Sequence, residues 1–173
     1  MNKASNSSSI VIYTDGACLG NPGPGGYAAI ILTEGARQEL SGGFRLTTNN
    51  RMELLAAIKG LQWLKKPSRV TLYSDSQYLV KNYNEGSVAR WKAKGWMRDR
   101  KNPAKNKDLW EEILNLVSIH EVTFRWVEGH AGNAENERCD RLSVMMAKKK
   151  GLPVDEVFEN GENEKPLQAG LFG

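Results

Sequence analysis

The stretch Tyr13–Gly26, YTDGACLGNPGPGG, decides the fold of this sequence. It places Asp15 at the end of an apolar run, Ile10–Tyr13, and follows it with a turn rich in glycine and proline. The run alternates β-branched and aromatic residues, which predicts a strand. A carboxylate at the end of a strand, beside backbone that can approach a ligand closely, indicates a metal or phosphate site. The turn lacks the Gly-Lys-Ser/Thr ending of a P-loop, which argues against a phosphate loop.

The composition is typical of one soluble globular domain. With 173 residues and 40% hydrophobic residues, the chain can form a single core. No apolar run approaches the roughly 18 residues of a membrane-spanning helix. Residues 1–9 are polar and lack the apolar segment of a signal peptide, so we expect a flexible lead and a cytoplasmic location. Cys18 and Cys139 form no paired-cysteine zinc motif, and we expect two reduced thiols.

The net charge of +4 conceals a concentration of basic residues in one segment. Residues 90–107, RWKAKGWMRDRKNPAKNK, carry eight Lys or Arg and one acid, a charge of +7, so the rest of the chain sums to −3. Such a patch is the electrostatic signature of a protein that binds a polyanion. Trp91 and Trp96 stand among these cations, and indole rings suit contacts with sugars and bases. We therefore expect nucleic-acid contact here; the alternative is a solvated charged loop.

The hydrophobic pattern predicts an α/β fold, a mixed sheet flanked by helices. Strands are expected at 10–14, 27–32 and 38–46, joined as an antiparallel meander, and later at 69–74 and 122–127. Helices are expected at 50–65, directly after 75, near 107–116 and at 134–150. For the helix at 50–65, Asn49 or Asn50 is the expected N-cap and Glu53 lies in the first turn. Residues 151–173, with five acids and one lysine, are expected to be a disordered acidic tail after a domain at 10–150.

Four acidic residues stand where ligands bind in α/β sheets. Asp15 and Asp75 each end a predicted strand. Glu53 opens a predicted helix and Asp140 lies in the last one. Alone, each is explained by solvation or, for Glu53, by a helix cap. Together they indicate a hard-cation site, because Mg²⁺ prefers oxygen ligands and binds through few carboxylates plus a substrate phosphate. Without a metal, such acids would repel one another and a nucleic-acid phosphate.

His130 is a candidate proton carrier. It lies in a loop between Gly129 and Gly132, shortly before the last predicted helix. A lone loop histidine is usually polar surface, but near a metal site an imidazole can move protons at neutral pH. His120 has no such neighbours.

The chain resembles type-1 ribonuclease H, the enzyme that cuts RNA in RNA–DNA hybrids, from about Ile10 to Lys148. The resemblance rests on YTDGACLGNPGPGGYAAI, TTNNRMELLAAI, SDSQYLV, the Trp-rich basic segment and WVEGHAGNAENERCDRL. Five motifs in the right order are highly specific. The resemblance implies a ribonuclease H-like fold: a five-stranded mixed sheet whose first three strands are antiparallel, with flanking helices.

The resemblance also implies roles for individual residues. Asp15, Glu53, Asp75 and Asp140 would bind two catalytic Mg²⁺ ions, with Mn²⁺ as a substitute, and His130 would assist the reaction or product release. The implied substrate contacts are Gly16, Cys18, Asn21, Asn50 and Gln77 for the RNA strand, Thr48 and Asn49 for DNA or its phosphates, and the basic protrusion near 87–107, with Trp91 and Trp96, for the hybrid. The implied products carry a 5′-phosphate and a 3′-hydroxyl, and the implied role is removal of RNA primers and R-loops.

One residue departs from the family pattern. Glu128 stands two residues before His130, where family members often carry a lysine. We expect weaker phosphate attraction there or an altered loop.

Two other functions fit the residues less well. Another nuclease of the same fold, such as a DNA exonuclease or an integrase, would share scattered acids but not the NPGPGGY turn or the TTNNRMEL segment. A hybrid-binding module without catalysis conflicts with the presence of all four acids and His130. Nothing in the sequence demands oligomerisation, so a monomer is expected.

The end of the chain suggests a partner. Gln168, Leu171 and Phe172 form a QxxLF pattern that resembles the peptide by which bacterial replication proteins dock on the sliding clamp. An acidic linker before a small apolar anchor suits such docking; the alternative is a random apolar end.

Overall fold

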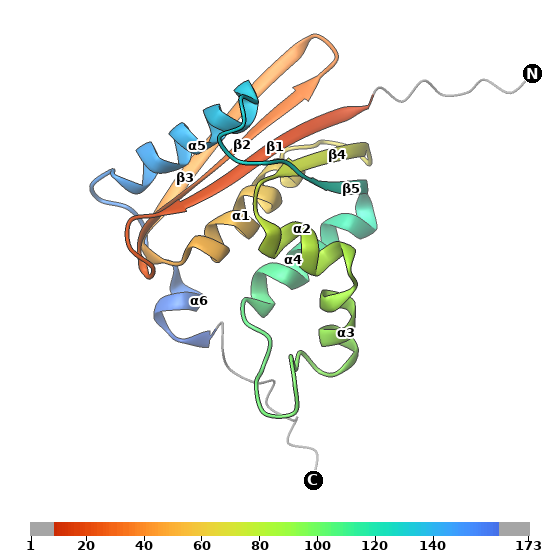
Figure 1. Cartoon of the computed structure of the whole chain (residues 1–173), viewed down its shortest axis with the longest axis vertical. Helices are drawn as coiled ribbons and strands as arrows, with labels where there is room; N and C mark the ends of the chain where they lie inside the picture. Colours follow the sequence, from red (N-terminus) through yellow and green to blue (C-terminus); the bar gives the residue numbers. More distant parts are fainter. Residues whose placement is uncertain (1–8, 163–173) are drawn as a thin grey trace, which may run out of the picture.

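A five-stranded mixed sheet organises residues 9–162, the part of the chain that the computed structural model describes (Figure 1). The strands are β1 (Ile10–Cys18), β2 (Gly23–Thr33), β3 (Ala36–Thr47), β4 (Arg69–Ser74) and β5 (Glu121–Trp126), in the spatial order β3-β2-β1-β4-β5. The first three strands are antiparallel, and β4 and β5 run parallel to β1. The predicted fold class is confirmed.

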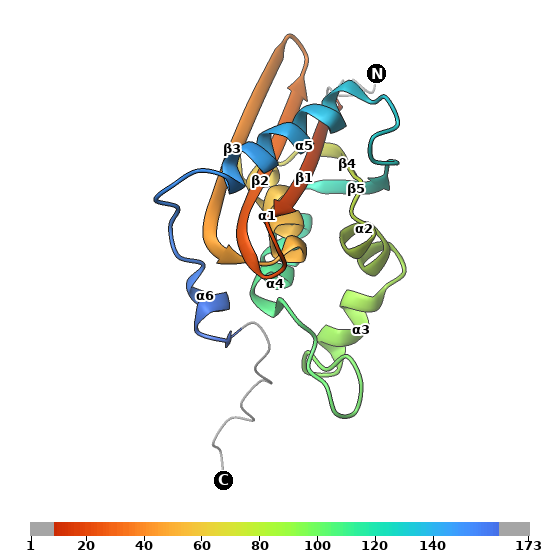
Figure 2. The same ribbon diagram turned by 60° about the vertical axis from the view of Figure 1, so that its left-hand side comes forward.

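Helices cover both faces of the sheet. They are α1 (Asn49–Gln62), α2 (Gln77–Asn84), α3 (Ser87–Ala93), α4 (Lys107–Ile119), α5 (Ala134–Ala147) and α6 (Glu156–Glu159). Helices α1 and α4 pack together on one face, and α5 lies on the other face across β1, β2 and β3 (Figure 2). The short helix expected after Asp75 is present as α2, the helix α3 that follows it was not predicted, and α5 ends at Ala147 instead of residue 150.

The strand β2 is buried on both faces, because its side chains alternate between two hydrophobic clusters. Ala29 and Ile31 join the large cluster that includes α1 and α4. Ala28 and Ile30 pack with Leu142 of α5. Strand side chains alternate between the two faces of a sheet with a period of two. Helices therefore pack against the centre of the sheet from both sides. The neighbouring strand β1, which carries Asp15, likewise packs between α1 and α5.

The N-terminus of α1 differs from the prediction. Thr48, not Asn49 or Asn50, is the N-cap: its Oγ1 accepts a hydrogen bond from the Arg51 N–H at 3.2 Å. Asn49 is the first helical residue, and its N–H donates to Asn21 Oδ1 at 3.2 Å. Glu53 is not a helix cap either, since its side chain is buried beneath the helix. A tertiary contact thus places the helix start one residue earlier than the local pattern suggests.

Residues 151–162 contact the domain, although the sequence predicted a disordered tail there. The Arg45 N–H on β3 donates to the Pro153 carbonyl oxygen at 2.9 Å, and Asp155 caps α6 and is buried. Polar contacts hold this segment, so the sequence showed no apolar pattern there. Gln168, Leu171 and Phe172 lie outside the described residues. Within residues 9–162, no helix has the length and apolar character needed to cross a membrane.

Candidate metal centre

Three of the four predicted acids meet at one edge of the sheet. Asp15 belongs to β1, Asp75 directly follows β4, and Glu53 lies in the second turn of α1. One carboxylate oxygen from each lies within 4.8 Å of the others. Because β1 and β4 run parallel with Thr14 opposite Ser74, the next residue on each strand, Asp15 and Asp75, lies at the same level. The sheet register thus brings together acids that are 60 residues apart in sequence.

Gly16 allows Glu53 to join the two aspartates. A Cβ atom at position 16 would lie 2.5 Å from the carbonyl carbon of Met52 and closer still to the Glu53 nitrogen. Any side chain there would push α1 away from β1. The Asp-Gly pair at 15 and 16 therefore supplies both a carboxylate and the close helix approach that places a second carboxylate beside it.

The cluster is an electrostatically uncompensated, buried group of acids. Burial and the charge of Asp75 raise the pKa of Asp15 to about 8, with a smaller contribution from Asp140. Burial, followed by the charges of Asp15 and Asp75, raises the pKa of Glu53 well above its usual range. Glu53 Oε2 is buried and has no hydrogen-bond partner among the described residues. Crowded oxygen ligands with an unsatisfied acceptor fit a hard divalent cation, which would supply the missing positive charge.

Asp140 approaches the cluster from the other face of the sheet. It lies on α5, where the neighbouring Cys139 is buried and its Sγ donates to the Tyr13 carbonyl oxygen at 3.3 Å. This contact holds the helix against β1, two residues from Asp15. Asp140 is half-buried, is not part of the three-acid group, and is close enough to raise the pKa of Asp15. The structure therefore places it at the border of the cluster.

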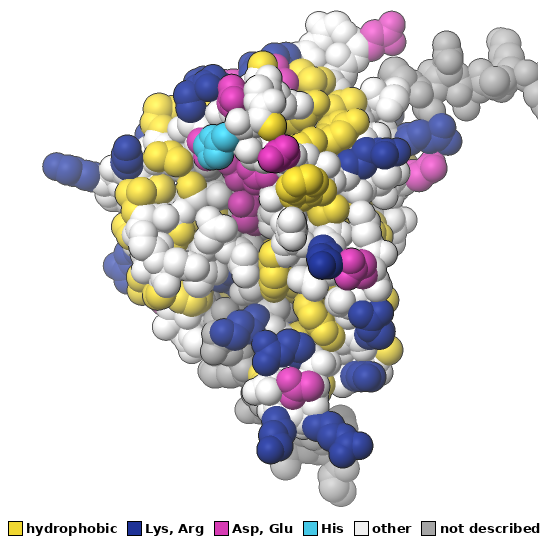
Figure 3. Space-filling model, in the orientation of Figure 1, with side chains coloured by type: hydrophobic (Ala, Val, Ile, Leu, Met, Phe, Trp, Pro, Cys, Tyr) yellow, Lys and Arg dark blue, Asp and Glu magenta, His cyan; other side chains and the backbone are white. Residues whose placement is uncertain are grey.

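His130 lies exposed in the loop between β5 and α5, with a left-handed φ of 58°. The residue before it, Gly129, packs on the cluster: a Cβ atom there would lie 2.8 Å from Asp75 Oδ2. The loop can pass this close because residue 129 has no side chain. Figure 3 shows acidic side chains gathered in a hollow of this face with a histidine beside them. Glu128 is exposed on the same loop.

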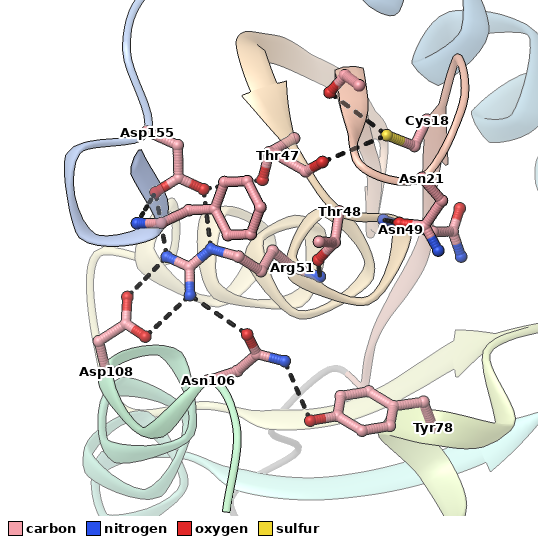
Figure 4. Close-up of polar contacts among 12 residues, drawn as sticks. Cys18, Asn21, Thr47, Thr48, Asn49, Arg51, Tyr78, Asn106, Asp108 and Asp155 are labelled. Carbon is pink, nitrogen blue, oxygen red and sulfur yellow. Dashed lines mark hydrogen bonds and ion pairs between the residues drawn. The ribbon is translucent and has the colours of Figure 1, made fainter. Parts of the chain in front are cut away.

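Several predicted substrate contacts gather where the β1–β2 turn meets the start of α1 (Figure 4). Asn21 and Asn49 are joined by the hydrogen bond described above. Cys18 is half-buried, and its Sγ donates to the carbonyl oxygens of Gly23 and Thr47 at 3.4 and 3.5 Å. Thr48 caps the helix and Asn50 is exposed. These polar groups form a surface that we call the α1 edge, made of Cys18, Asn21, Thr48, Asn49 and Asn50.

Gln77 lies on the other side of the cluster, as the first residue of α2. It lines a surface hollow of about 340 Å³ together with Trp126, the last residue of β5. The Trp126 side chain is 47% exposed, and its Nε1 donates to the Asp75 carbonyl oxygen at 3.1 Å. The sequence analysis missed this indole, because only the tertiary structure shows that it faces solvent beside Asp75.

Trp91 and Trp96 do not form the exposed aromatic surface that the sequence suggested. Trp96 is only 5% exposed and belongs to the core cluster. Trp91 is half-buried and packs edge-on against Trp110, with ring centroids 6.3 Å apart. Both indoles anchor the segment from α3 to Asn106 on the domain. The cations of this segment remain outside: Lys92, Lys94, Arg98, Arg100 and Lys101 are all exposed.

A mixed sheet of order β3-β2-β1-β4-β5, with Asp15 within β1 and Asp75 directly after β4, defines the ribonuclease H-like class of fold and site, although β1 continues to Cys18 and does not end at Asp15 as the sequence predicted. Comparison with known proteins specifies the family. The RNase H family model matches residues 7–148. The chain therefore belongs to the RNase H family.

Individual relatives agree with this assignment. A protein named ribonuclease H from Desulforamulus reducens is 57% identical over 154 residues, which are 89% of this chain and 97% of that one. Another from Syntrophus aciditrophicus is 62% identical over 146 residues, 84% of each chain. Among solved structures, LC9-RNase H1, a type 1 RNase H with the type 2 active-site motif, has a TM-score of 0.71 at 34% identity, covering 82% of this chain and 72% of that chain.

Proposed function

We propose a two-metal mechanism for this chain, which as a member of the RNase H family is an endoribonuclease acting on RNA–DNA hybrids. The observation that carries the proposal is the cluster of Asp15, Glu53 and Asp75, in which one carboxylate oxygen from each lies within 4.8 Å of the others. Asp140, at the border of the cluster, is proposed as the fourth ligand. When bound, two Mg²⁺ ions would polarise the scissile phosphate and stabilise the leaving oxygen.

The side chains of the cluster have distinct parts in this proposal. Asp15 lies on β1, the central strand of the sheet, and interacts with Glu53, Asp75 and Asp140, so its carboxylate would be the one shared by the ions. Glu53 contributes Oε2, the buried oxygen that has no partner within the described region. His130, exposed on a loop that approaches Asp75 at Gly129, would accept or deliver a proton at the reacting phosphate. The expected products carry a 5′-phosphate and a 3′-hydroxyl.

The surroundings of the cluster support binding of a hybrid. Short polar side chains on both sides of the acids, Asn21 and Asn50 on the α1 edge and Gln77 on α2, can hydrogen-bond the 2′-hydroxyl that distinguishes RNA from DNA. Thr48 and Asn49 are proposed to contact DNA or its phosphates. The exposed cations of residues 92–101 extend the contact to the phosphate backbone, so binding should weaken as salt rises. Trp126 is added as a contact, because its exposed indole can stack on a base or sugar beside Asp75.

We further propose Mg²⁺ as the working ion, with Mn²⁺ as a substitute, and action as a cytoplasmic monomer on RNA primers and R-loops. Docking of Gln168, Leu171 and Phe172 on the sliding clamp stays a prediction. Binding of a labelled peptide of residues 163–173 to the clamp would test it, and no detectable binding at high micromolar concentration would contradict it.

The central experiment compares three substrates: a labelled RNA–DNA hybrid, duplex DNA and duplex RNA, each with and without Mg²⁺. Cleavage of the hybrid alone, and only with metal, is expected. Asp15→Asn should lower the rate by about 10³-fold or more, since it removes a charge that holds the ions. Glu34→Gln, an exposed acid in the β2–β3 turn, is the matched control and should cleave like the wild type. Full activity of Asp15→Asn would refute the metal assignment, and cleavage of duplex DNA would favour the exonuclease or integrase alternative.

A further inference from the structure

A buried guanidinium links three distant parts of the chain behind the α1 edge (Figure 4). Arg51, in the first turn of α1, has a side chain that is only 3% exposed. Its Nε donates to Asp155 Oδ2 at 2.8 Å and its Nη2 to Asp155 Oδ1 at 3.1 Å. On its other side, Nη1 and Nη2 donate to the two carboxylate oxygens of Asp108 at 2.9 and 2.7 Å. Helix α1, helix α4 and the C-terminal segment thus meet at one cation.

The Arg51 guanidinium remains charged although it is buried. Burial disfavours the charged guanidinium, but hydrogen bonds to Asp108 and Asp155 outweigh it, so the pKa of Arg51 is raised. Bidentate contacts of this kind are among the strongest hydrogen bonds in proteins, and they fix the orientation of both partners. Asp155, with a 6% exposed side chain, is therefore fixed in direction as well as in place.

Asp155 also holds the backbone that leads into the α1 edge. Its Oδ2 accepts a hydrogen bond from Thr47 Oγ1 at 2.7 Å, and Thr47 is the last residue of β3. The carbonyl oxygen of Thr47 accepts from Cys18, and the next residue, Thr48, caps α1 through the Arg51 N–H. Asp155 thus contacts the residues on both sides of Thr48 and Asn49, namely Thr47 and Arg51.

We propose that Asp155 is a positioning residue for the substrate: through Thr47 and Arg51, it fixes the α1 edge in the geometry that binds the hybrid. The proposal rests on the proposed function, because it assigns substrate contact to Thr48, Asn49 and Cys18. It gives the segment from Gly151 to Glu162 a part in recognition, although this segment lies beyond the residues matched by the family model. Asp155 touches neither the acid cluster nor the proposed reacting atoms, so the effect should fall on binding and leave the chemical step intact.

Two variants test the contacts of Asp155. One changes its carboxylate, and the other removes the Thr47 hydroxyl that donates to it. Asp155→Asn keeps the size of the side chain but loses the charge and cannot accept all of these hydrogen bonds. Thr47→Val keeps the shape and the backbone carbonyl but loses the hydroxyl. Glu159→Gln is the matched control: it lies in the same segment, and its exposed pair with Arg45 is far more accessible than the buried network, with Arg45 59% exposed. All variants are made in the full chain and assayed at a temperature at which circular dichroism shows them folded.

The expected result is a separation of KM from kcat on the RNA–DNA hybrid. Asp155→Asn and Thr47→Val should raise KM about fivefold with kcat within about twofold of the wild type, since ground-state and transition-state binding are weakened equally. Glu159→Gln should leave both constants unchanged. If both variants keep the wild-type KM while their midpoint of urea unfolding falls, the network only stabilises the fold and the proposal is overturned.

Direct binding separates this proposal from the proposed function. Fluorescence anisotropy of labelled hybrid, measured with a chelator present, gives Kd without cleavage. If the wild type binds the hybrid but never cleaves it, the proposed chemistry fails, and a rise in Kd for Asp155→Asn and Thr47→Val still supports the positioning role. An unchanged Kd, or no hybrid binding by the wild type, overturns it.

Discussion

Two groups of buried charges lie side by side on helix α1, and they are built in opposite ways. Glu53 joins Asp15 and Asp75 in a cluster with no cation within the described residues close enough to neutralise it. Arg51, two positions earlier, lies between two carboxylates that hydrogen-bond it fully. In the acid cluster the pKa values of Asp15 and Glu53 are raised, whereas the Arg51 guanidinium is neutralised by Asp108 and Asp155. Buried charges without an opposite charge beside them mark a place that binds a ligand. Buried charges paired with an opposite charge mark a place that fixes the fold.

Glu53→Gln tests the uncompensated group most strongly. Removing one charge from a three-acid site should lower kcat/KM for the hybrid by about 10³-fold or more, because the ions lose a ligand. Steady-state cleavage at saturating Mg²⁺ measures this. Glu112→Gln on α4 serves as the control acid and should lie within twofold of the wild type. Activity of Glu53→Gln within tenfold of the wild type would show that the cluster is not the catalytic centre.

Arg51→Met tests the compensated group. Without the guanidinium, Asp108 and Asp155 would face each other across a largely buried space, so unfolding free energy should fall by about 3–5 kcal/mol. Urea unfolding monitored by circular dichroism gives the change. A loss below about 1 kcal/mol would mean that the network is no more important than an exposed ion pair.

The two groups should also differ in how stability depends on pH. Because the pKa of Asp15 is raised to about 8 in the folded protein, from 3.8, folding takes up protons between about pH 4 and pH 8. The metal-free protein should therefore lose stability as pH rises through this window and level off above it. In Asp15→Asn the unfolding free energy should fall less between these pH values. At pH 8 this variant should be more stable than the wild type by about 1–3 kcal/mol.

Urea midpoints at pH 5 and pH 8, measured with a chelator, test this pH dependence. Added Mg²⁺ should restore the stability of the wild type at pH 8, because an ion that binds only the folded state stabilises that state. It should raise the stability of Asp15→Asn much less. A wild type that gains stability from pH 5 to pH 8 without metal would contradict the raised pKa of Asp15.

The smallest effect is expected at the surface. Arg45→Met removes the pair with Glu159, in which the Arg45 side chain is 59% exposed, and should leave the urea midpoint close to that of the wild type. The same urea series as for Arg51→Met measures it. If Arg45→Met and Arg51→Met lowered stability in urea equally, the buried network would contribute no more to stability than an ordinary surface contact.

The sequence determined the strands, the main helices and the acids of the site. Alternating apolar residues in β1 and β4 are local signals, and the acid that follows each predicted strand core reaches the same level of the sheet because Thr14 pairs with Ser74 in the parallel register. Asp15, Glu53 and Asp75 were therefore predicted as a group, and their clustering is confirmed, whereas their roles in catalysis stay predictions. Asp140 was predicted with them, but the structure places it at the border of the group.

Only the tertiary structure decided the remaining features, because each depends on partners that are distant in the chain. Arg51 finds Asp155 across 104 residues, and this contact orders a segment whose polar composition indicated disorder. Trp96 is buried against the core although it stands in a strongly basic run, and Trp126 is exposed although it ends a strand. The sequence by itself thus determined which residue types meet at the site. The packing of long-range partners decided which charges are neutralised, which indoles face solvent and how the α1 edge is held.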